Sequence, residues 1–511
     1  MMKNIIGIVK SLFIVLIVSV SFICHGETAP EKREFRGAWL HVIGQSQYQN
    51  MSPAKCKSYI QQQLDRLQSA GCNAVIFQVR PCADALYKSD LEPWSNWLTG
   101  RRGKAPEPMW DPMQFTLDEA HKRGMEFHAW LNPYRVSSNL SKDYIPENHD
   151  SKRHPERYFK YDGKLFFDPA YQENRDFICK VVEDIMTRYD VDAIHIDDYF
   201  YPYPVAGNPL TADAASYAKF GNGKNKNDWR RHNVDLLIEQ LHKTIRTNKP
   251  WVRFGISPFG IWRNKKNDSR GSNSSGLQNY DDLYADILLW VDKGWVDYLV
   301  PQLYWNLDLQ AAPSRHLAEW WNNNVKDPVQ LYIGQDTKRT MDVADARTGA
   351  RNELASKIEL SRKLKNVGGN VWWHGYWVTD NYKGVRDSLT NHFQRTIALP
   401  PSWSNLALKD SKPQAPRNLR IIRSHGKTFL EWDSPKTTGN EDDAMRFVVY
   451  SFLPEESMSN LNNPEAIIAL TGFNRVAISD DEDPESIEGL RFAVTSLDRL
   501  NRESDAVTLR R

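Results

Sequence analysis

The sequence predicts an α/β fold in which a (β/α)8 TIM barrel is followed by a small all-β sandwich. Strand-like and helix-like segments alternate eight times between residues 35 and 380, which is typical of parallel strands joined by crossover helices. Connections from helix to strand are short, whereas those from strand to helix are long, as in 81–110 and 133–169. Long loops at one end only indicate a barrel whose C-terminal face forms a cleft.

Periodicity and capping residues predict the elements of the barrel. A helix is expected over 52–70, because Ser52 can cap it and Pro53 fits its first turn. The other expected helices are 111–123, 170–189, 228–247, 280–293, 314–324 and 351–366, with a short one near Asp380. Apolar runs rich in β-branched and aromatic residues predict the strands, which are 35–42, 73–80, 125–132, 191–197, 251–258, 296–305, 329–334 and 369–376.

The pattern changes after residue 399. Residues 400–415 are expected to be a Pro-rich linker between a barrel over 34–399 and a second domain over 416–511, with few contacts across it. Short strands at 418–422, 428–432, 446–452, 475–478 and 491–496 predict an immunoglobulin-like sandwich. The runs PRNL (416–419), LEW (430–432) and FAVTSLD (492–498) resemble a fibronectin type III domain, although Phe492 replaces the usual tyrosine.

Residues 1–26 have the pattern of a cleavable signal peptide. Lys3 and Lys10 flank an apolar run over 12–23, which is too short to span a bilayer. Cleavage is expected after Gly26, so we expect an exported chain without a transmembrane helix, located in the periplasm, on the cell surface or outside the cell. Cys24 offers lipidation as an alternative, which Ile23 disfavours because such signals have a small residue there.

Charge and cysteine content exclude several classes of protein. The 66 basic and 64 acidic residues balance, so neither nucleic acid nor an anionic membrane surface is an expected partner. Removing residues 1–26 leaves four cysteines without CxxC spacing, which predicts free thiols and no disulfide framework. No GxSxG motif, Walker loop or dinucleotide fingerprint occurs. We expect a monomer that needs no cofactor.

The expected strand 191–197 carries the strongest signal for chemistry. Ile194 and Ile196 share the face that packs under helices, so His195 and Asp197 point into the barrel. Asp198 follows at the start of the loop. Carboxylates at the C-terminal ends of strands are the usual catalytic groups of barrel enzymes, although Asp198 could instead cap the next turn.

The same alternation brings polar and aromatic side chains to the ends of other strands. Flat rings can stack on sugar rings, while amides and guanidinium groups can bind hydroxyls, so a carbohydrate site is predicted. On the last strand the alternation predicts that Trp372, His374 and Tyr376 point inward. The predicted substrate-binding residues are Arg80, Trp130, Asn132, Tyr134, His195, Tyr199, Gln302, Tyr304, Trp305, Asn306 and His374.

Five runs of this sequence resemble the glycosyl hydrolase-like 10 family. They are FRGAW (35–39), FQVR (77–80), HAWLNPYR (128–135), HIDDY (195–199) and PQLYW (301–305), and the resemblance extends over about 34–399. It implies a (β/α)8 barrel and glycoside hydrolysis, with bacterial cell-wall glycan strands as a candidate substrate. It does not assign the catalytic carboxyl groups.

We therefore expect an exported glycoside hydrolase acting on a polysaccharide. Such enzymes normally need two carboxyl groups, one to protonate the leaving oxygen and one to act as nucleophile or base. Asp197 is the predicted nucleophile or base. Asp198 is the nearest candidate for the acid, and Asp336 and Asp308, which follow the seventh and sixth strands, are the alternatives.

Two other functions stay open at this point. A non-catalytic glycan-binding barrel would keep the aromatic cleft but would lack a carboxylate partner for Asp197. A metal-dependent polysaccharide deacetylase or amidase would use inward-facing histidines, for which His41, His128, His195 and His374 are candidates. No HxH or HxxxH spacing occurs among the 13 histidines, so no metal is expected.

Overall fold

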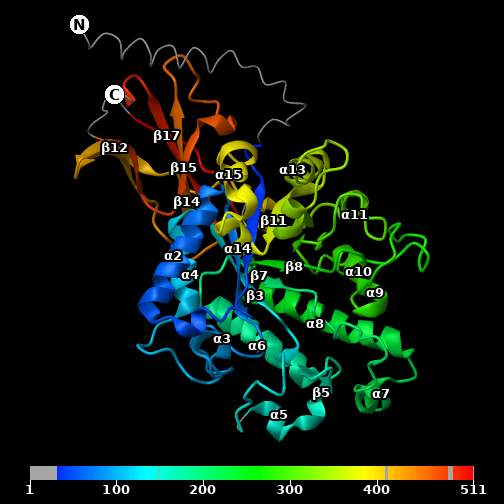
Figure 1. Cartoon of the computed structure of the whole chain (residues 1–511). Coiled ribbons are helices and arrows are strands. Elements are labelled where there is room, and N and C mark those ends of the chain that lie inside the picture. The colour runs from blue at the N-terminus through cyan, green and yellow to red at the C-terminus, as the bar shows by residue number, and fades with distance from the viewer. Residues whose placement is uncertain (1–30, 148, 409–411, 481–486, 510–511) are drawn as a thin grey trace. The chain divides into compact units, whose positions relative to one another are not determined.

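A computed structural model of the chain describes residues 31–147, 149–408, 412–480 and 487–509. Eight parallel strands form a closed barrel in the order β1-β11-β10-β9-β8-β7-β3-β2, and helices surround these strands (Figure 1). The predicted (β/α)8 fold is confirmed. The strands are β1 (Phe35–Leu40), β2 (Ala74–Arg80), β3 (Glu126–Leu131), β7 (Ala193–Ile196), β8 (Arg253–Ile256), β9 (Tyr298–Leu299), β10 (Gln330–Asp336) and β11 (Val367–Trp373).

The crossover helices lie close to the predicted positions. Helix α2 (Pro53–Ser69) begins where the Ser52 side chain accepts from the Lys55 backbone N–H, as capping residues do. The prediction of one helix over 280–293 is wrong, because Tyr284 has a left-handed backbone (φ 56°) and the Asp286 side chain caps a new helix. The others are α4 (Pro112–Lys122), α6 (Gln172–Arg188), α8 (Lys226–Asn248), α9 (Asn279–Asp282), α10 (Ile287–Asp292), α11 (Ser314–Asn324) and α13 (Leu354–Lys363).

Short elements that the sequence analysis did not predict fill the long loops. Between β3 and α6, strands β4 (Arg135–Ser137), β6 (Lys164–Phe167) and β5 (Tyr158–Tyr161) form an antiparallel sheet. Asp162 and Gly163 both have positive φ angles, 48° and 68°, as hairpin turns require. This Asp-Gly pair was the signal missed. The other unpredicted short helices are α3 (Asn96–Thr99), α5 (Asp150–Arg153), α7 (Ala214–Phe220), α12 (Thr337–Asp342) and α15 (Val385–Ser388), whereas α14 (Gly375–Thr379) is the short helix predicted near Asp380.

Aromatic side chains fill the interior of the barrel in place of the aliphatic layers common to this fold. The rings of Phe35 and Tyr332 stack with centroids 4.1 Å apart, and the ring of Tyr298 lies against both. The Tyr298 hydroxyl lies 3.1 Å from His195 Nδ1. A Cβ at Gly255 would lie 1.9 Å from the Tyr298 ring, so the absence of a side chain there makes room for this tyrosine.

Two antiparallel sheets follow the barrel, shown in orange and red in Figure 1. One pairs strands in the order β12-β13-β16, and the other in the order β15-β14-β17-β18. The all-β prediction for this region is confirmed, although β15 and β18 were not predicted; the type III resemblance stays a prediction. The strands are β12 (Arg417–Ser424), β13 (Lys427–Asp433), β14 (Ala444–Phe452), β15 (Ile467–Thr471), β16 (Arg475–Asp480), β17 (Arg491–Asp498) and β18 (Val507–Thr508).

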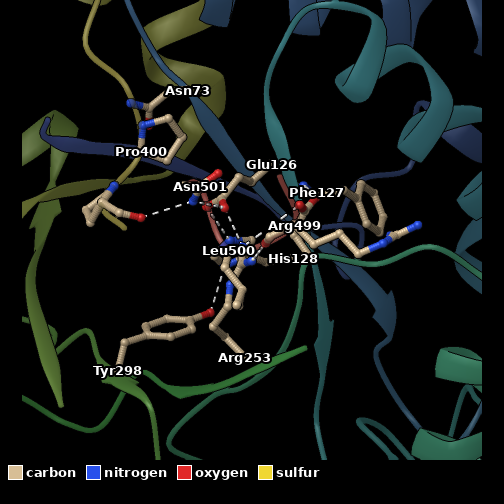
Figure 2. Close-up of polar contacts among 12 residues, drawn as sticks. Asn73, Glu126, Phe127, His128, Arg253, Tyr298, Pro400, Arg499, Leu500 and Asn501 are labelled. Carbon is tan, nitrogen blue, oxygen red and sulfur yellow. Dashed lines mark hydrogen bonds and ion pairs between the residues drawn. The ribbon is translucent and has the colours of Figure 1, made fainter. Parts of the chain in front are cut away.

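The loop between β17 and β18 closes the N-terminal end of the barrel (Figure 2). Leu500 is fully buried in the apolar cluster of the barrel interior. Asn501 Nδ2 donates to Glu126 Oε1 at 2.8 Å, and Arg253 Nη1 donates to the Arg499 carbonyl at 2.8 Å. Because Glu126 and Arg253 are the first residues of β3 and β8, this loop contacts the strand starts directly.

Buried ion pairs reinforce the closure. Glu126 pairs with Arg253, and Arg446 Nη2 of β14 lies 2.6 Å from Asp192 Oδ1, just before β7. Both side chains of this second pair are almost fully buried, at 0% and 4% exposure. Burying such charges at the strand starts requires partners, and the C-terminal sheets provide them. The expectation that few contacts cross the linker is therefore wrong.

Residues 1–30 lie outside the described part of the chain, and with them the predicted signal peptide and Cys24. Within the described residues, no helix has the length and apolar character needed to cross a membrane.

The contacts that close the N-terminal end of the barrel lead to a prediction about stability. Arg446→Met keeps much of the side-chain volume but leaves Asp192 without its closest cation, so it should destabilise the fold by about 3–5 kcal/mol. Thermal melting should therefore begin several degrees lower. Lys412→Met is the matched control, because the Lys412–Asp505 pair is 71% and 80% exposed and solvent screens its attraction. Equal melting temperatures for the two variants would contradict the role given to the closure.

Candidate active site

A pocket of about 400 Å³ opens at the C-terminal ends of the barrel strands. Strands or strand ends from most of the barrel contribute to it, so its shape depends on the closure of the whole sheet. Aromatic and polar side chains alternate on its wall. Its lining consists of Trp39, His41, Ile43, Gln78, Trp130, Arg135, Asp197, Asp198, Tyr199, Tyr203, Ser257, Gln302, Tyr304, Trp373 and His374.

Asp197 lies directly after β7, and its carboxyl group is held on several sides. Trp130 Nε1 donates to Oδ2 at 3.0 Å, and Asn132 Nδ2 donates to Oδ1 and Oδ2 at 3.0 and 3.2 Å. The Tyr199 backbone N–H is a weaker donor at 3.4 Å. Burial raises the pKa of Asp197, while Arg135 and these hydrogen bonds oppose the rise. The arrangement favours an oriented anion.

Asp198 has a different environment. Its side chain is buried and accepts a hydrogen bond from the Tyr203 hydroxyl. Burial and the neighbouring charge of Asp197 raise the pKa of Asp198 to about 7. Two adjacent carboxyl groups cannot both ionise cheaply in a buried site, so near neutral pH Asp197 carries the charge and Asp198 retains a proton. An ionised carboxylate next to a protonated carboxyl group is the combination that a base and an acid require.

Four aromatic rings form a box beside the carboxyl groups. Trp373 stacks almost parallel to Tyr304, with centroids 6.3 Å apart and planes 4° apart. The Trp39 and Trp130 rings also lie against Trp373, with ring centroids 6.2 and 6.0 Å from the centroid of Trp373. Such faces suit the C–H groups of a sugar and its apolar substituents.

The remaining wall is polar but mostly uncharged. The Arg135 guanidinium lies 4.9 Å from the centre of the Tyr199 ring. His41 and His374 meet edge to face with centroids 4.4 Å apart. Burial and the proximity of His374 lower the pKa of His41 to about 3, and burial also lowers the pKa of His374. Both imidazoles are therefore neutral and can bind hydroxyl groups.

His195 lies beneath this pocket and does not line it. Its Nε2 accepts from Trp39 Nε1 at 3.3 Å and lies 3.0 Å from Ser257 Oγ. Burial and the nearby His128 hold the pKa of His195 well below its ordinary value. A neutral imidazole with these hydrogen bonds holds the Trp39 ring in place.

Comparison with known proteins identifies the family of the chain. The family model described as Glycosyl hydrolase-like 10 matches residues 34–347. The chain belongs to the glycosyl hydrolase-like 10 family. The predicted membership is thereby confirmed, and it supports a carbohydrate-active protein.

Two relatives and one solved structure illustrate the similarity. The chain is 36% identical over 515 residues to "Glycosyl hydrolase YngK" of Bacillus subtilis, covering 99% of this chain and 98% of that protein. It is 37% identical over 370 residues to "Glycosyl hydrolase DigH" of Escherichia coli K12, covering 67% of this chain and 83% of that protein. The PgaB (BpsB) glycoside hydrolase domain from Bordetella bronchiseptica aligns at 10% identity and TM-score 0.46, covering 70% of this chain and 98% of that chain.

In this glycosyl hydrolase-like 10 barrel, several predicted binding residues lie outside the pocket. Arg80 is fully buried and pairs with Glu92 at 2.6 Å, since a β-bulge between Gln78 and Arg80 changes the phase of β2. Asn132 is buried behind Asp197 and orients it. Besides His195, the other predicted residues that do not line the pocket are Tyr134, which is fully buried, and Trp305 and Asn306.

The two alternative acids also lie outside the lining. Asp336 caps α12, where its Oδ1 accepts from the Arg339 backbone N–H at 2.8 Å. Asp308 is 44% exposed and pairs with Arg315 and Arg347. Neither lines the pocket, so Asp198 is the better candidate for the acid.

The prediction for the last strand is right for His374 but wrong for Trp372 and Tyr376. Trp372 packs outward into the main apolar core, as does Tyr376, whereas Trp373 and His374 line the pocket. The run Val371–His374 has aromatic residues in both phases, so alternation alone could not choose between them. Tyr203 and Ser257 were also missed, because they lie beyond strand ends or carry no distinctive spacing.

A second cavity of about 620 Å³ lies between α6 and the loops after β2 and β3. Its lining includes Glu92, Asp150 and Arg157, and these groups are engaged in ion pairs such as Arg157–Asp150 at 3.3 Å. No barrel strand contributes to it, so the strand-end pocket remains the candidate active site. Across the described ranges, no three His, Cys, Asp or Glu residues are grouped closely enough to bind a metal ion.

The buried acid predicts a pH-dependent stability. The folded-state pKa of Asp198, about 7, exceeds its ordinary value of 3.8. Between these two pKa values the folded chain holds this proton while the unfolded chain releases it. The free energy of unfolding therefore falls as pH rises from the lower value to the higher one, by up to about 4 kcal/mol. Asp198→Asn cannot ionise. Its melting temperature should therefore rise relative to the parent between pH 4 and 7 and then level off.

Asp308→Asn is the control for this measurement. Its ion pairs are exposed to solvent and should contribute little at any pH. Parallel melting curves for the parent and Asp198→Asn across this pH range would show that Asp198 does not retain its proton.

Proposed function

We propose that this protein is a glycoside hydrolase in which Asp198 is the general acid and Asp197 is the fixed anion beside the reacting sugar. The observation that carries the proposal is the pair itself. Two adjacent carboxyl groups have separate protonation states inside an aromatic pocket at the C-terminal end of a barrel. This combination is what glycosidic bond cleavage needs.

The chemistry follows from the geometry. The protonated Asp198 donates to the glycosidic oxygen and so makes it a better leaving group. The charge of Asp197 stabilises the positive charge that develops on the sugar ring in the transition state. Because Trp130 and Asn132 hold Asp197 in place, little reorganisation is needed as that charge appears.

The substrate is proposed to be a polysaccharide, with bacterial cell-wall glycan strands as the candidate. The printed names of the two relatives, both "Glycosyl hydrolase", support the reaction class. The export signal expected in residues 1–26 would bring the protein to that substrate. We further propose a monomer without a cofactor.

Two alternatives have distinct outcomes. A non-catalytic glycan-binding protein would bind strands without releasing new reducing ends. A metal-dependent deacetylase or amidase would lose activity with a chelator and would release acetate or cleave amide bonds. A balanced panel of glycans, assayed for both reducing ends and released acetate with and without chelator, separates all three.

Asp197→Asn should abolish hydrolysis while leaving the fold intact. Asn is nearly isosteric and keeps one acceptor oxygen, but it cannot carry the negative charge. Losing such a group typically costs about 10³-fold or more in turnover, roughly 4 kcal/mol. Turnover should be measured together with the melting temperature. If Asp197→Asn kept most of its turnover with an unchanged melting temperature, the assignment would be wrong.

Asp198→Asn tests the acid by its dependence on the leaving group. Hydrolysis of natural glycosidic bonds should fall by a factor comparable to that of Asp197→Asn. Cleavage of an aryl glycoside with a nitrophenolate leaving group should fall much less, because that group departs without a proton. Asp336→Asn is the matched control, since Asn also caps helices well and Asp336 lies outside the pocket lining. Its activity should stay near that of the parent.

A further inference from the structure

The placement of the two carboxyl groups does not suit either of the usual glycosidase mechanisms. Asp197 and Asp198 are the only carboxyl groups among the described residues that line the pocket. They are consecutive and follow β7 directly, so both reach the pocket from the same wall. An inverting enzyme needs its carboxyl groups about 6.5–9.5 Å apart on opposite faces of the sugar. The opposite wall carries Trp373 and His374 instead.

Asp197 is also poorly suited to form a bond with the sugar. Two side-chain donors contact its oxygens at 3.0–3.2 Å, and hydrogen bonds to a carboxylate stabilise its charge and reduce its nucleophilicity. Attack would require the carboxylate to leave these donors. Its Oδ1 accepts from Asn132 Nδ2 at 3.0 Å and makes a second, long contact of 3.4 Å with the Tyr199 N–H, so a donor on the substrate can take the place of that long contact.

The pocket offers no other good nucleophile among its described residues. Burial raises the pKa of Tyr199 to about 12, and it holds the pKa values of Tyr203 and Tyr304 well above their ordinary value. These phenols are neutral. His41 and His374 lie on the far wall, and each packs against the ring of Trp373. The attacking group must therefore come from elsewhere.

The aromatic box indicates which chemical group of the substrate lies next to Asp197. Trp39, Trp130, Tyr304 and Trp373 surround a space next to Asp197, and Trp130 contributes to both features because its Nε1 bonds Asp197. A substituent with a small apolar group and an adjacent hydrogen-bond donor would satisfy both features. Its apolar group would fill the box, and its donor would bond to the Asp197 carboxylate. The methyl and N–H of an acetamido substituent have this arrangement.

We propose that the pocket acts on glycans bearing a 2-acetamido group, whose own carbonyl oxygen is the nucleophile while Asp197 holds its N–H and Asp198 supplies the proton. This inference rests on the proposed glycosidase function and specifies its substrate class. Asp197 is then the group that orients and polarises the amide. The aromatic box selects the acetamido methyl.

The steps balance without any further reagent except water. The amide oxygen bonds to the anomeric carbon, the glycosidic C–O bond breaks, and the leaving oxygen takes the proton of Asp198. The resulting oxazolinium ion donates its N–H to Asp197. Water then attacks the anomeric carbon and gives a proton to Asp198, and the ring opens to restore the acetamido group. The product keeps the configuration of the substrate.

The first test compares matched polymers that differ only at the amide. Peptide-free cell-wall glycan strands are assayed for new reducing ends before and after chemical N-deacetylation. We expect the deacetylated strands to be cut at least about 10³-fold more slowly, since the intramolecular nucleophile is lost. Comparable rates would overturn this inference and leave the glycosidase proposal standing. Failure to cut either polymer, or any other glycan of the panel, would overturn both.

The second test asks whether Asp197 forms a covalent bond. Asp197→Ala is incubated with an activated aryl 2-acetamido glycoside and sodium azide. If Asp197 were the nucleophile, azide would take its place and yield a glycosyl azide of inverted configuration. We expect no such product, and its appearance would contradict the inference.

The third test measures binding without turnover. A thiazoline fused to the sugar ring mimics the oxazolinium ion, and calorimetry should show that the parent binds it. Asp197→Asn should weaken this binding at least 10-fold, because the charged partner of the ring nitrogen is lost, with an unchanged melting temperature. Asp336→Asn is again the control. Equal affinities for the parent and Asp197→Asn would contradict the role given to Asp197.

Discussion

The cost of burying two adjacent carboxyl groups governs this site. Asp197 and Asp198 are 3% and 2% exposed, so each would resist ionisation by itself, and each raises the cost for the other. The surrounding donors decide which one becomes the anion. Trp130 and Asn132 contact Asp197, and Arg135 lies near it, whereas Asp198 has the neutral Tyr203 hydroxyl. An acid and an anion therefore arise from identical residues.

Much of this arrangement could be predicted from sequence because strand alternation is a local property. The isoleucines of β7 placed Asp197 inward, and the eightfold strand–helix repeat predicted the barrel. The prediction failed where geometry depends on neighbours. A bulge in β2 turned Arg80 toward Glu92, and both phases of β11 carried aromatic rings. The protonation of Asp198 depends on desolvation by residues far along the chain, which no single-strand pattern contains.

The predicted binding role of Asn132 shows the same limit of sequence-based prediction. Its place in the run HAWLNPYR suggested a contact with sugar hydroxyls, and its inward phase was correct. In the structure it is fully buried, and its amide is committed to Asp197. Sequence can predict that a polar side chain points toward a site, but only the packing around it determines whether it reaches substrate or a neighbouring catalytic group.

The closure of the barrel by the β17–β18 loop bears on how the chain acquires its fold. The strand starts carrying Glu126, Asp192 and Arg253 lack their C-terminal partners until Arg446 and Arg499 to Asn501 arrive. About 100 residues separate Leu399 from Leu500, so at roughly 5–20 residues per second the ribosome needs about 5–20 s to deliver them. During that interval the barrel core is incomplete. The late arrival of this closing segment would suit the export that we propose, because a barrel that lacks its last contacts is easier to keep unfolded for translocation.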